Sequence, residues 1–101
     1  MNTKIICGKF YNGDKAYRSE NGQHYFKFQF LNQRNYYIIN CTEHPSFNGQ
    51  SSSVEKTHLY SSGSICFVKG KEPRTIWEAE SRAKEWAEYF LEYRKTGKAK
   101  S

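Results

Sequence analysis

The chain has 101 residues, a net charge of +6 and 17% aromatic residues, which indicates one small folded domain rather than a disordered chain. It has no apolar run near the ~20 residues that a membrane-spanning helix needs, and residues 1–7 lack the apolar centre of a secretory signal. We therefore expect a cytoplasmic protein without a membrane partner.

The first part of the chain predicts short strands separated by turns. Thr3–Tyr11 is predicted to be a strand, with Ile5, Cys7 and Lys9 alternating against Ile6, Gly8 and Phe10, and Asn12-Gly13-Asp14 is a turn sequence. Ala16–Arg18 predicts a short strand, and Asn21-Gly22 is a strong hairpin signal.

The middle of the chain predicts two longer strands. Gln23–Leu31 alternates most clearly, with its phenylalanines on one face, and His24 at its start is expected at the rim of the sheet. Tyr36–Cys41 is the next strand, and its less regular alternation indicates packing against a helix or burial on both faces. The shared face of the first of these strands consists of Phe26, Phe28 and Phe30.

A long polar loop is predicted at Thr42–Ser64, and loops of this length in small domains are usually functional or disordered. A short extended stretch at Ser64–Lys69 carries Cys66, and Gly70–Arg74 is a second loop.

The last element is predicted to be a helix. Thr75 is its expected N-cap, with Glu78 completing a capping box, and Gly97 its expected stop. We expect one domain over residues 1–97 and a basic tail over residues 98–101. The apolar stripe consists of Ile76, Ala79, Ala83, Trp86, Ala87, Phe90 and Tyr93.

The cysteines and histidines match no metal-ligand spacing. Cys7, Cys41 and Cys66 are odd in number and contain no CxxC pair, which argues against a zinc site and a disulfide framework. The spacing of His44 and His58 matches no ligand motif either. We expect free thiols, no metal and no other cofactor.

Cys66 is the candidate nucleophile. It follows a turn at Gly63, and a thiol acts through its thiolate when it is accessible. The alternative from chemistry alone is a small buried hydrophobic residue between Ile65 and Phe67. Tyr60 either gates the thiol or packs beneath the loop.

The stretch Tyr60-Ser-Ser-Gly-Ser-Ile-Cys66 resembles the active-site segment of ubiquitin-conjugating enzymes, where a glycine turn precedes an Ile-Cys or Leu-Cys pair. It is more similar to bacterial ubiquitin-conjugating-like proteins of antiphage operons, including the cyclic-oligonucleotide (CBASS) type. Those proteins carry a histidine-aliphatic-tyrosine run before the turn, as His58-Leu59-Tyr60 does here. Their Trp- and Tyr-rich helix ending in Thr-Gly resembles residues 86–97, and a strand leading to a proline loop resembles Tyr37–Phe47.

The resemblance implies an α+β fold in which an antiparallel meander of about four strands carries a long C-terminal helix on one face. It implies a transferase of antiviral defence in which Cys66 forms a thioester with the C-terminus of a modifier or partner protein and passes it to an acceptor amine. Tyr60, Gly63 and Ser64 would form the supporting loop. Implied partners are a nucleotide-cyclase-like enzyme and an activating enzyme.

The chain departs from the eukaryotic members of this family. They have His-Pro-Asn before the cysteine, and here His58 occupies the position of the asparagine that stabilises the oxyanion. His58 either donates a hydrogen bond there or is a structural loop residue. The N-terminal and late helices are missing, and the tryptophan that follows the cysteine falls late, at Trp77.

Two other functions stay open. One is a non-catalytic binding module of the same fold. The other, less favoured, is a nucleic-acid-binding domain that uses the positive charge and exposed rings such as Tyr25 and Tyr36. The basic residues of the C-terminal stretch also suit an acidic protein partner or a solvated helix end; they are Arg82, Lys84, Arg94, Lys95, Lys98 and Lys100.

Overall fold

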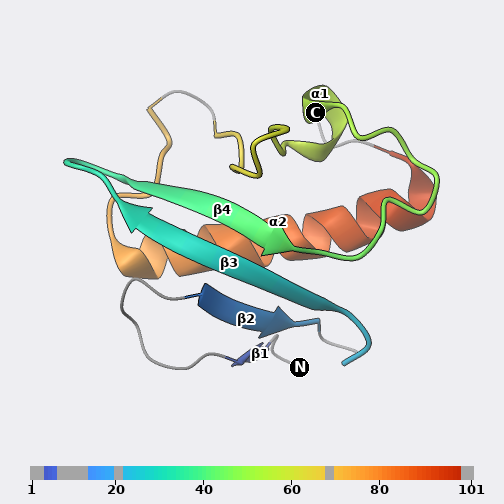
Figure 1. Cartoon of the computed structure of the whole chain (residues 1–101), viewed down its shortest axis with the longest axis horizontal. Helices are drawn as coiled ribbons and strands as arrows, with labels where there is room; N and C mark the ends of the chain where they lie inside the picture. Colours follow the sequence, from blue (N-terminus) through green and yellow to red (C-terminus); the bar gives the residue numbers. More distant parts are fainter. Residues whose placement is uncertain (1–3, 7–13, 20–21, 68–69, 99–101) are drawn as a thin grey trace.

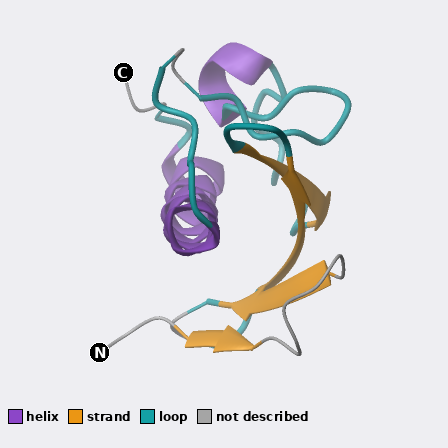
Figure 2. Ribbon diagram, turned by 90° about the vertical axis from the view of Figure 1, so that its left-hand side faces the viewer, coloured by secondary structure: helices purple, strands orange, loops and turns teal. Residues whose placement is uncertain are grey.

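A long helix lies across one face of an antiparallel sheet in the computed structural model of the chain (Figures 1 and 2). The structure describes residues 4–6, 14–19, 22–67 and 70–98. The strand order is β1-β2-β3-β4, and neighbouring strands are antiparallel. The elements are β1 Lys4–Ile6, β2 Asp14–Arg18, β3 Tyr25–Asn32, β4 Tyr37–Glu43, α1 Val54–Thr57 and α2 Ile76–Thr96.

The predicted α+β class, an antiparallel sheet with a C-terminal helix on one face, is confirmed. Strands β2 to β4 form the body of the sheet, and the three-residue β1 lies at its edge. Only Lys4–Ile6 of the strand predicted at Thr3–Tyr11 falls within the described residues, and the turn at Asn12-Gly13 lies outside them. Asp14, predicted in that turn, instead begins β2 and pairs with Gln29.

Alternation along β3 builds the core. Phe26, Phe28 and Phe30 are buried, and Tyr25 and Lys27 between them are exposed, because successive side chains of a strand point to opposite faces. The strand begins two residues later than predicted. Between β2 and β3 the Ser19 amide donates to the His24 carbonyl (2.9 Å), and Asn21 of the predicted Asn21-Gly22 turn lies outside the described residues.

Strand β4 contributes to the same core. Ile39 lies opposite Phe30 and Cys41 lies opposite Phe28, and both β4 side chains are buried. β4 is two residues longer at its C-terminal end than predicted, since it continues to Glu43. One side of β4 faces α2, as the irregular alternation of Tyr36–Cys41 had indicated.

Helix α2 begins and ends where the sequence predicted. The Glu78 amide donates to the Thr75 hydroxyl (3.1 Å), and the Glu78 carboxylate accepts from the amide of Arg74 (2.7 Å), one residue earlier than in a standard capping box. Gly97 ends the helix in the left-handed conformation, with φ of 75°, and its amide donates to the Tyr93 carbonyl (2.7 Å).

The apolar face of α2 packs against the phenylalanines of β3. Phe26 meets the ring of Phe90 edge to face, with centroids 5.9 Å apart, and Phe28 meets Trp86 in the same way at 6.1 Å. Such T-shaped pairs match the edge of one ring to the face of the other. Ile76, predicted in the stripe, is only partly buried. Within the described residues, neither helix has the length and apolar character to cross a membrane.

The loop predicted at Thr42–Ser64 is more structured than expected. Its first two residues belong to β4, and α1 forms at Val54–Thr57. Thr57 is fully buried, and its hydroxyl donates to the Ser53 carbonyl (2.9 Å) and accepts from the amide of Leu59 (3.1 Å). A four-residue helix has too little internal hydrogen bonding to be predicted from local pattern.

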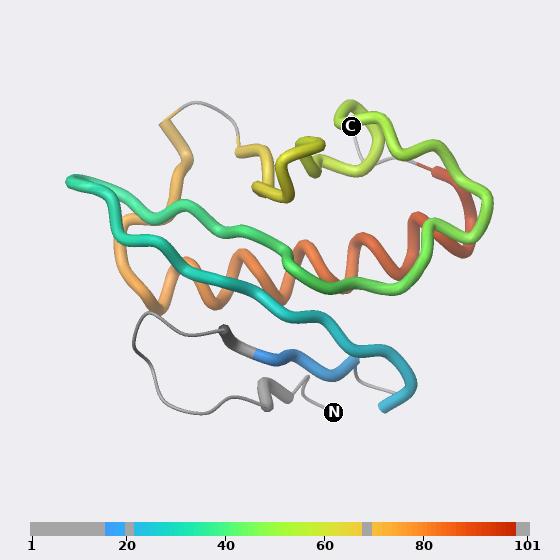
Figure 3. The backbone as a smooth tube through the Cα atoms, in the orientation of Figure 1, coloured from blue at the N-terminus to red at the C-terminus, as the bar shows by residue number. Residues whose placement is uncertain are grey.

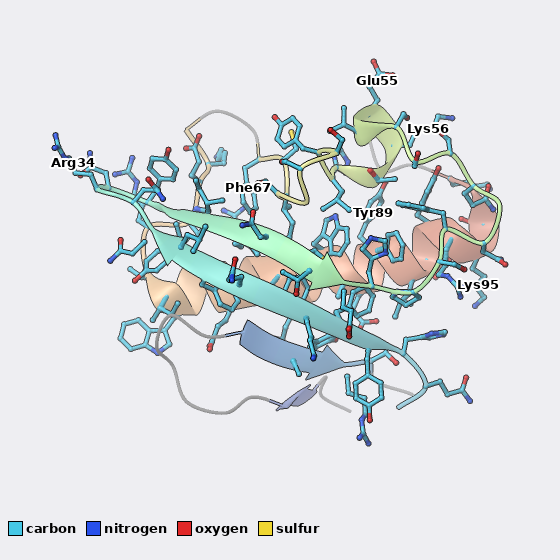
Figure 4. All side chains as sticks on the ribbon, viewed as in Figure 1. Arg34, Glu55, Lys56, Phe67, Tyr89 and Lys95 are labelled. Atoms are coloured by element: carbon cyan, nitrogen blue, oxygen red, sulfur yellow. The ribbon has the colours of Figure 1, made fainter. Side chains whose placement is uncertain are left out.

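The C-terminal half of α2 binds residues 46–57, which we call the 46–57 segment, through side-chain donors. Figure 3 follows the chain from β4 around this end of α2 and back over it. Figure 4 shows Tyr89 and, above α2, Lys56 of this segment. Each of four α2 side chains donates to one backbone carbonyl of the segment: Trp86 to Thr57 (2.9 Å), Tyr93 to Ser51 (2.7 Å), Arg94 to Ser46 (2.8 Å), and Tyr89 to Lys56.

Candidate functional site

Residues 58–66 form a narrow hairpin that carries the candidate nucleophile. Leu59 pairs with Ile65 in an antiparallel bridge. On one side of this bridge the Tyr60 amide donates to the Ser64 carbonyl (2.9 Å), and on the other the Cys66 amide donates to the His58 carbonyl (2.7 Å). The predicted extended stretch around Cys66 is therefore one arm of this hairpin.

Gly63 makes the turn of the hairpin possible. Its φ is 100°, a conformation that residues with a Cβ rarely adopt. A Cβ at this position would also meet the carbonyl oxygen of Cys41 at 3.4 Å. The close approach is needed because the Gly63 carbonyl accepts from the Cys41 amide (2.7 Å). The role predicted for Gly63 in the supporting loop thus has a geometric basis.

The hairpin is bound to the free edge of β4. The Ile65 amide donates to the Ile39 carbonyl (2.9 Å), and Asn40 pairs with Ser64 in an isolated bridge. The Ser64 hydroxyl donates to the side-chain oxygen of Asn40 (2.8 Å). Because β4 belongs to the packed sheet, these bonds fix the position of the cysteine-bearing arm relative to the core.

The two faces of the hairpin have different environments. Leu59 and Ile65 point inward and are buried in the core. Opposite pairs in a hairpin share a face, so Tyr60 and Cys66 both lie on the other face, diagonally across the bridge. Tyr60 is 47% exposed and Cys66 is half-buried. Cys66 is therefore less buried than the alternative of a small buried hydrophobic residue implies.

The pKa of the Tyr60 phenol responds to the neighbouring Cys66 side chain. Hydrogen bonding and charge interaction with the Cys66 side chain raise the pKa of Tyr60 above its ordinary value. A raised pKa means that the phenol keeps its proton at neutral pH. That Tyr60 gates the thiol stays a prediction.

His58 is joined to Cys66 through its backbone. It ends α1 in the left-handed conformation, with φ of 58°, and its carbonyl accepts the Cys66 amide. Its ring lies against the ring of Tyr89, with centroids 5.3 Å apart. The structure therefore brings the His58 backbone to the cysteine, while its imidazole packs against α2.

The two described cysteines have different environments. Cys41 is 7% exposed, and its thiol donates to the Glu43 carbonyl (3.3 Å). Burial raises the pKa of Cys41 to about 12, so this thiol stays protonated at neutral pH and is a core residue. Cys66 is the more accessible of the pair. Cys7 lies outside the described residues.

Two surface hollows meet at Tyr60. One has a volume of about 610 Å³ and is lined by residues 60–63, the Ser52–Val54 stretch, Cys41 and Phe47. The other, about 280 Å³, lies on the other side and is lined mainly by rings and aliphatic side chains, including Tyr36 and Phe67. A molecule in either hollow would contact Tyr60.

The other candidate residues lie apart from this site. His44 packs its ring on Phe90 (5.2 Å) and shares a hydrogen bond with the Pro45 carbonyl (2.7 Å). His24 is half-buried and lines a separate hollow beside the C-terminal half of α2. Trp77 is 74% exposed. Among the described residues, no group of three His, Cys, Asp or Glu side chains is placed to hold a metal ion.

Sequence reasoning missed the link between α2 and this site. Tyr89 contacts the ring of His58 and donates to the Lys56 carbonyl, and Trp86 donates to the carbonyl next to His58. The indole N–H of Trp86 and the phenol of Tyr89 could have indicated this link, because such a group usually finds a hydrogen-bond acceptor when it is buried.

Comparison of the chain with protein-family models, with curated proteins and with solved structures found no match. The resemblance to ubiquitin-conjugating proteins thus depends on the motif residues of the chain itself.

Proposed function

We propose that this chain is a ubiquitin-conjugating-like acyl carrier. Cys66 forms a thioester with the C-terminus of a modifier or partner protein and passes the acyl group to an acceptor amine. On the motif resemblance, the setting is a bacterial antiphage operon of the CBASS type, in the cytoplasm. The partners would be an activating enzyme and a nucleotide-cyclase-like enzyme.

The observation that carries the proposal is the presentation of Cys66. The thiol is half-buried at the end of a hairpin that Gly63 turns and β4 fixes. A thiol that carries an acyl group must be reachable by two proteins in turn and must keep one position. The hairpin supplies a fixed position, and Cys66 is only partly buried there.

The proposed chemistry is acyl transfer in two steps. The Cys66 thiolate attacks the carbonyl carbon of an activated C-terminus, the activating group leaves, and a thioester forms. The acceptor amine then attacks this carbonyl, the C–S bond breaks, and the electron pair returns to sulfur as the amine loses its proton to solvent. The product is an amide, and Cys66 is free to react again.

The fold supports this proposal in its arrangement of elements. An antiparallel sheet, a hairpin with the cysteine at its edge and a following helix on one face occur in the order that the resemblance implies. The rings of α2 that match the bacterial family reach the segment leading to His58. They would position the histidine-aliphatic-tyrosine run.

The test is a trapping experiment in cells that express the chain with its native operon partners. Cys66→Lys should collect a stable amide adduct whose mass identifies the modifier, because a lysine amine replaces the thiol at the same site. The wild type should show an adduct that reducing agent releases, and Cys66→Ala should show none. Cys41→Ala is the matched control and should form the wild-type adduct, since Cys41 is a buried core thiol. Absence of any adduct from the wild type and from Cys66→Lys would contradict the proposal.

A second candidate is a non-catalytic binding module of the same fold. The packing of the His58 ring on Tyr89 favours it, because that ring occupies the position where the eukaryotic members have an oxyanion donor. On this alternative Cys66→Ala would keep the biological activity of the operon. The nucleic-acid alternative is weakened at Tyr25, whose ring is covered by the guanidinium of Arg18 at 4.9 Å.

A further inference from the structure

We propose that the hollow of about 280 Å³ beside the 58–66 hairpin binds the ammonium group of a lysine side chain that belongs to an acidic partner protein. This recognition function does not depend on the acyl transfer proposed for Cys66. The observation that carries it is the lining of the hollow, which consists of four aromatic rings, two isoleucines, two serines and one carboxylate. We call it the ring-lined hollow; its rings are Tyr36, Tyr37, Tyr60 and Phe67, and its carboxylate is that of Glu72.

The rings come to the ring-lined hollow from separate parts of the chain. Tyr36 and Tyr37 lie at the start of β4, and Tyr60 lies on the hairpin that is bound to the edge of that strand. Tyr36 is 40% exposed and Tyr60 is 47% exposed. Aromatic faces attract cations, and the chain already contains one such contact, between the guanidinium of Arg82 and the ring of Phe67 at 6.0 Å.

Glu72 supplies the negative charge of the ring-lined hollow. Its Oε1 accepts from the Gly70 amide (3.0 Å). The next residue of the same loop accepts from β4, where the Tyr37 amide donates to the Pro73 carbonyl (2.8 Å). These two bonds hold the carboxylate in the loop that faces the rings. A carboxylate beside aromatic rings is suited to an organic cation, because both groups favour positive charge.

The acceptors of the ring-lined hollow favour a lysine ammonium over other organic cations. One oxygen of Glu72 already accepts a hydrogen bond, whereas the planar guanidinium of arginine binds best to both oxygens of a carboxylate. The Ser64 hydroxyl donates to the side-chain oxygen of Asn40 (2.8 Å), so its own oxygen can accept from a further donor. A primary ammonium brings three donors, and a quaternary ammonium brings none.

The size of the ring-lined hollow fits one long side chain. Its volume of about 280 Å³ lies just below the roughly 300–1,000 Å³ that is usual for pockets that hold whole small-molecule ligands. The aliphatic stem of a lysine would pack on Ile38 and the rings while its ammonium reaches the carboxylate, as lysine stems do on apolar surface.

The charges around the ring-lined hollow restrict the partner that carries the lysine. Arg34 is exposed in the turn that the Gln33–Tyr36 hydrogen bond closes, and Lys71 and Arg74 are exposed beside Glu72. Together with the net charge of +6, these residues would repel a basic protein. The partner should therefore be acidic overall and present a single exposed lysine. A nucleic acid fits less well, because its phosphates would meet the Glu72 carboxylate.

A titration followed by the backbone amide shifts of the ¹⁵N-labelled chain tests this site. The probe is a five-residue peptide with one lysine between acidic residues, and its matched control carries norleucine, which has a similar stem without the ammonium. We expect the lysine peptide to shift the amides of residues 36–38, 60–65 and 72. It should bind about three- to tenfold more tightly than the norleucine peptide, as a hydrogen bond to a charged group implies.

Glu72→Gln should remove this preference for lysine. The glutamine keeps an oxygen that can accept from the Gly70 amide, so the loop should keep its conformation. Glu55→Gln is the matched control, because Glu55 is an exposed carboxylate of α1 outside the lining (Figure 4), and it should bind as the wild type does. Equal binding of the lysine and norleucine peptides, or an unchanged preference in Glu72→Gln, would overturn the inference.

Two further probes separate the remaining occupants. A peptide with trimethyllysine should bind more weakly than the lysine peptide, because its cation has no N–H to donate; tighter binding would contradict a hydrogen-bonded ammonium. A single-stranded oligonucleotide should leave the amides of the ring-lined hollow unshifted. Shifts there with the oligonucleotide and none with the lysine peptide would assign the rings to base stacking instead. All of these titrations leave Cys66 unmodified, so their outcome is separate from that of the trapping experiment.

Discussion

The core between the sheet and α2 and the 46–57 segment are stabilised in different ways. In the core, buried rings of β3 and α2 meet face to edge, and the stabilisation comes from apolar area removed from water. In the 46–57 segment, which leads to the candidate site, α2 side chains donate to backbone carbonyls. Helix α2 therefore has two structural roles. Its apolar stripe packs in the core, and the polar atoms of its side chains position the 46–57 segment.

The largest effect on the free energy of unfolding is expected from a substitution in the core. Phe26 is fully buried and packs on Phe90 and Trp86. Phe26→Ala should lower the free energy of unfolding by about 3–5 kcal/mol, because the cavity cannot collapse fully. Urea denaturation followed by circular dichroism measures it. Tyr36→Ala, at an exposed ring, is the control, and a comparable loss there would show that the phenylalanine face is not the main core.

Trp86 belongs to both regions and separates their contributions. Its ring packs on Phe28, and its indole N–H donates to the Thr57 carbonyl at 2.9 Å. Trp86→Phe keeps an aromatic ring and leaves that carbonyl without its donor, so we expect a loss of about 1–3 kcal/mol.

Hydrogen exchange shows where the stability lost in Trp86→Phe is located. We expect faster exchange at the Thr57 and Leu59 amides beside α1, while the amides of β3 keep their relative protection. A uniform increase in the exchange rates of β3 and α1 amides would mean that the indole of Trp86 acts through the core alone and does not position the 46–57 segment.

The core could be predicted from the sequence because its signals are local. The alternation at Phe26, Phe28 and Phe30 and the stripe that contains Trp86 and Phe90 are visible within a few residues of each other. Thr75 and Gly97 marked the helix ends for the same reason, since a cap acts on neighbouring backbone groups. Strand ends were less accurate: β4 runs to Glu43 because its pairing with Lys27 of β3 extends it.

The candidate site could be predicted only in part. Cys66 and Gly63 are marked by motif and by turn chemistry. The placement of Tyr60 and Cys66 on one face needs the register of the hairpin, which depends on the Leu59–Ile65 bridge. The packing of the His58 ring on Tyr89 joins residues far apart in the chain, and no local pattern encodes such a contact. The same is true of α1, which is too short to be stable without α2.

The smallest effect on the free energy of unfolding is expected from a substitution at the turn of the 58–66 hairpin. This substitution tests how the hairpin is held against the core. Gly63→Ala should cost about 1–2 kcal/mol for its left-handed backbone, with a further cost because the new Cβ lies 3.4 Å from the Cys41 carbonyl. Gly70→Ala is the matched control: its φ is 88°, and a Cβ there has nothing within 4 Å.

The excess of Gly63→Ala over Gly70→Ala in the free energy of unfolding, measured in urea, therefore isolates the contact between the hairpin and β4. If the contact fixes the cysteine, Gly63→Ala should also change the iodoacetamide labelling rate of Cys66, and Gly70→Ala should not. Equal costs and equal labelling in the two variants would mean that the close approach to β4 is dispensable. In that case the position of the thiol would depend on the Ile65–Ile39 hydrogen bond and the burial of Leu59 instead, since these are the other attachments of the hairpin to the core.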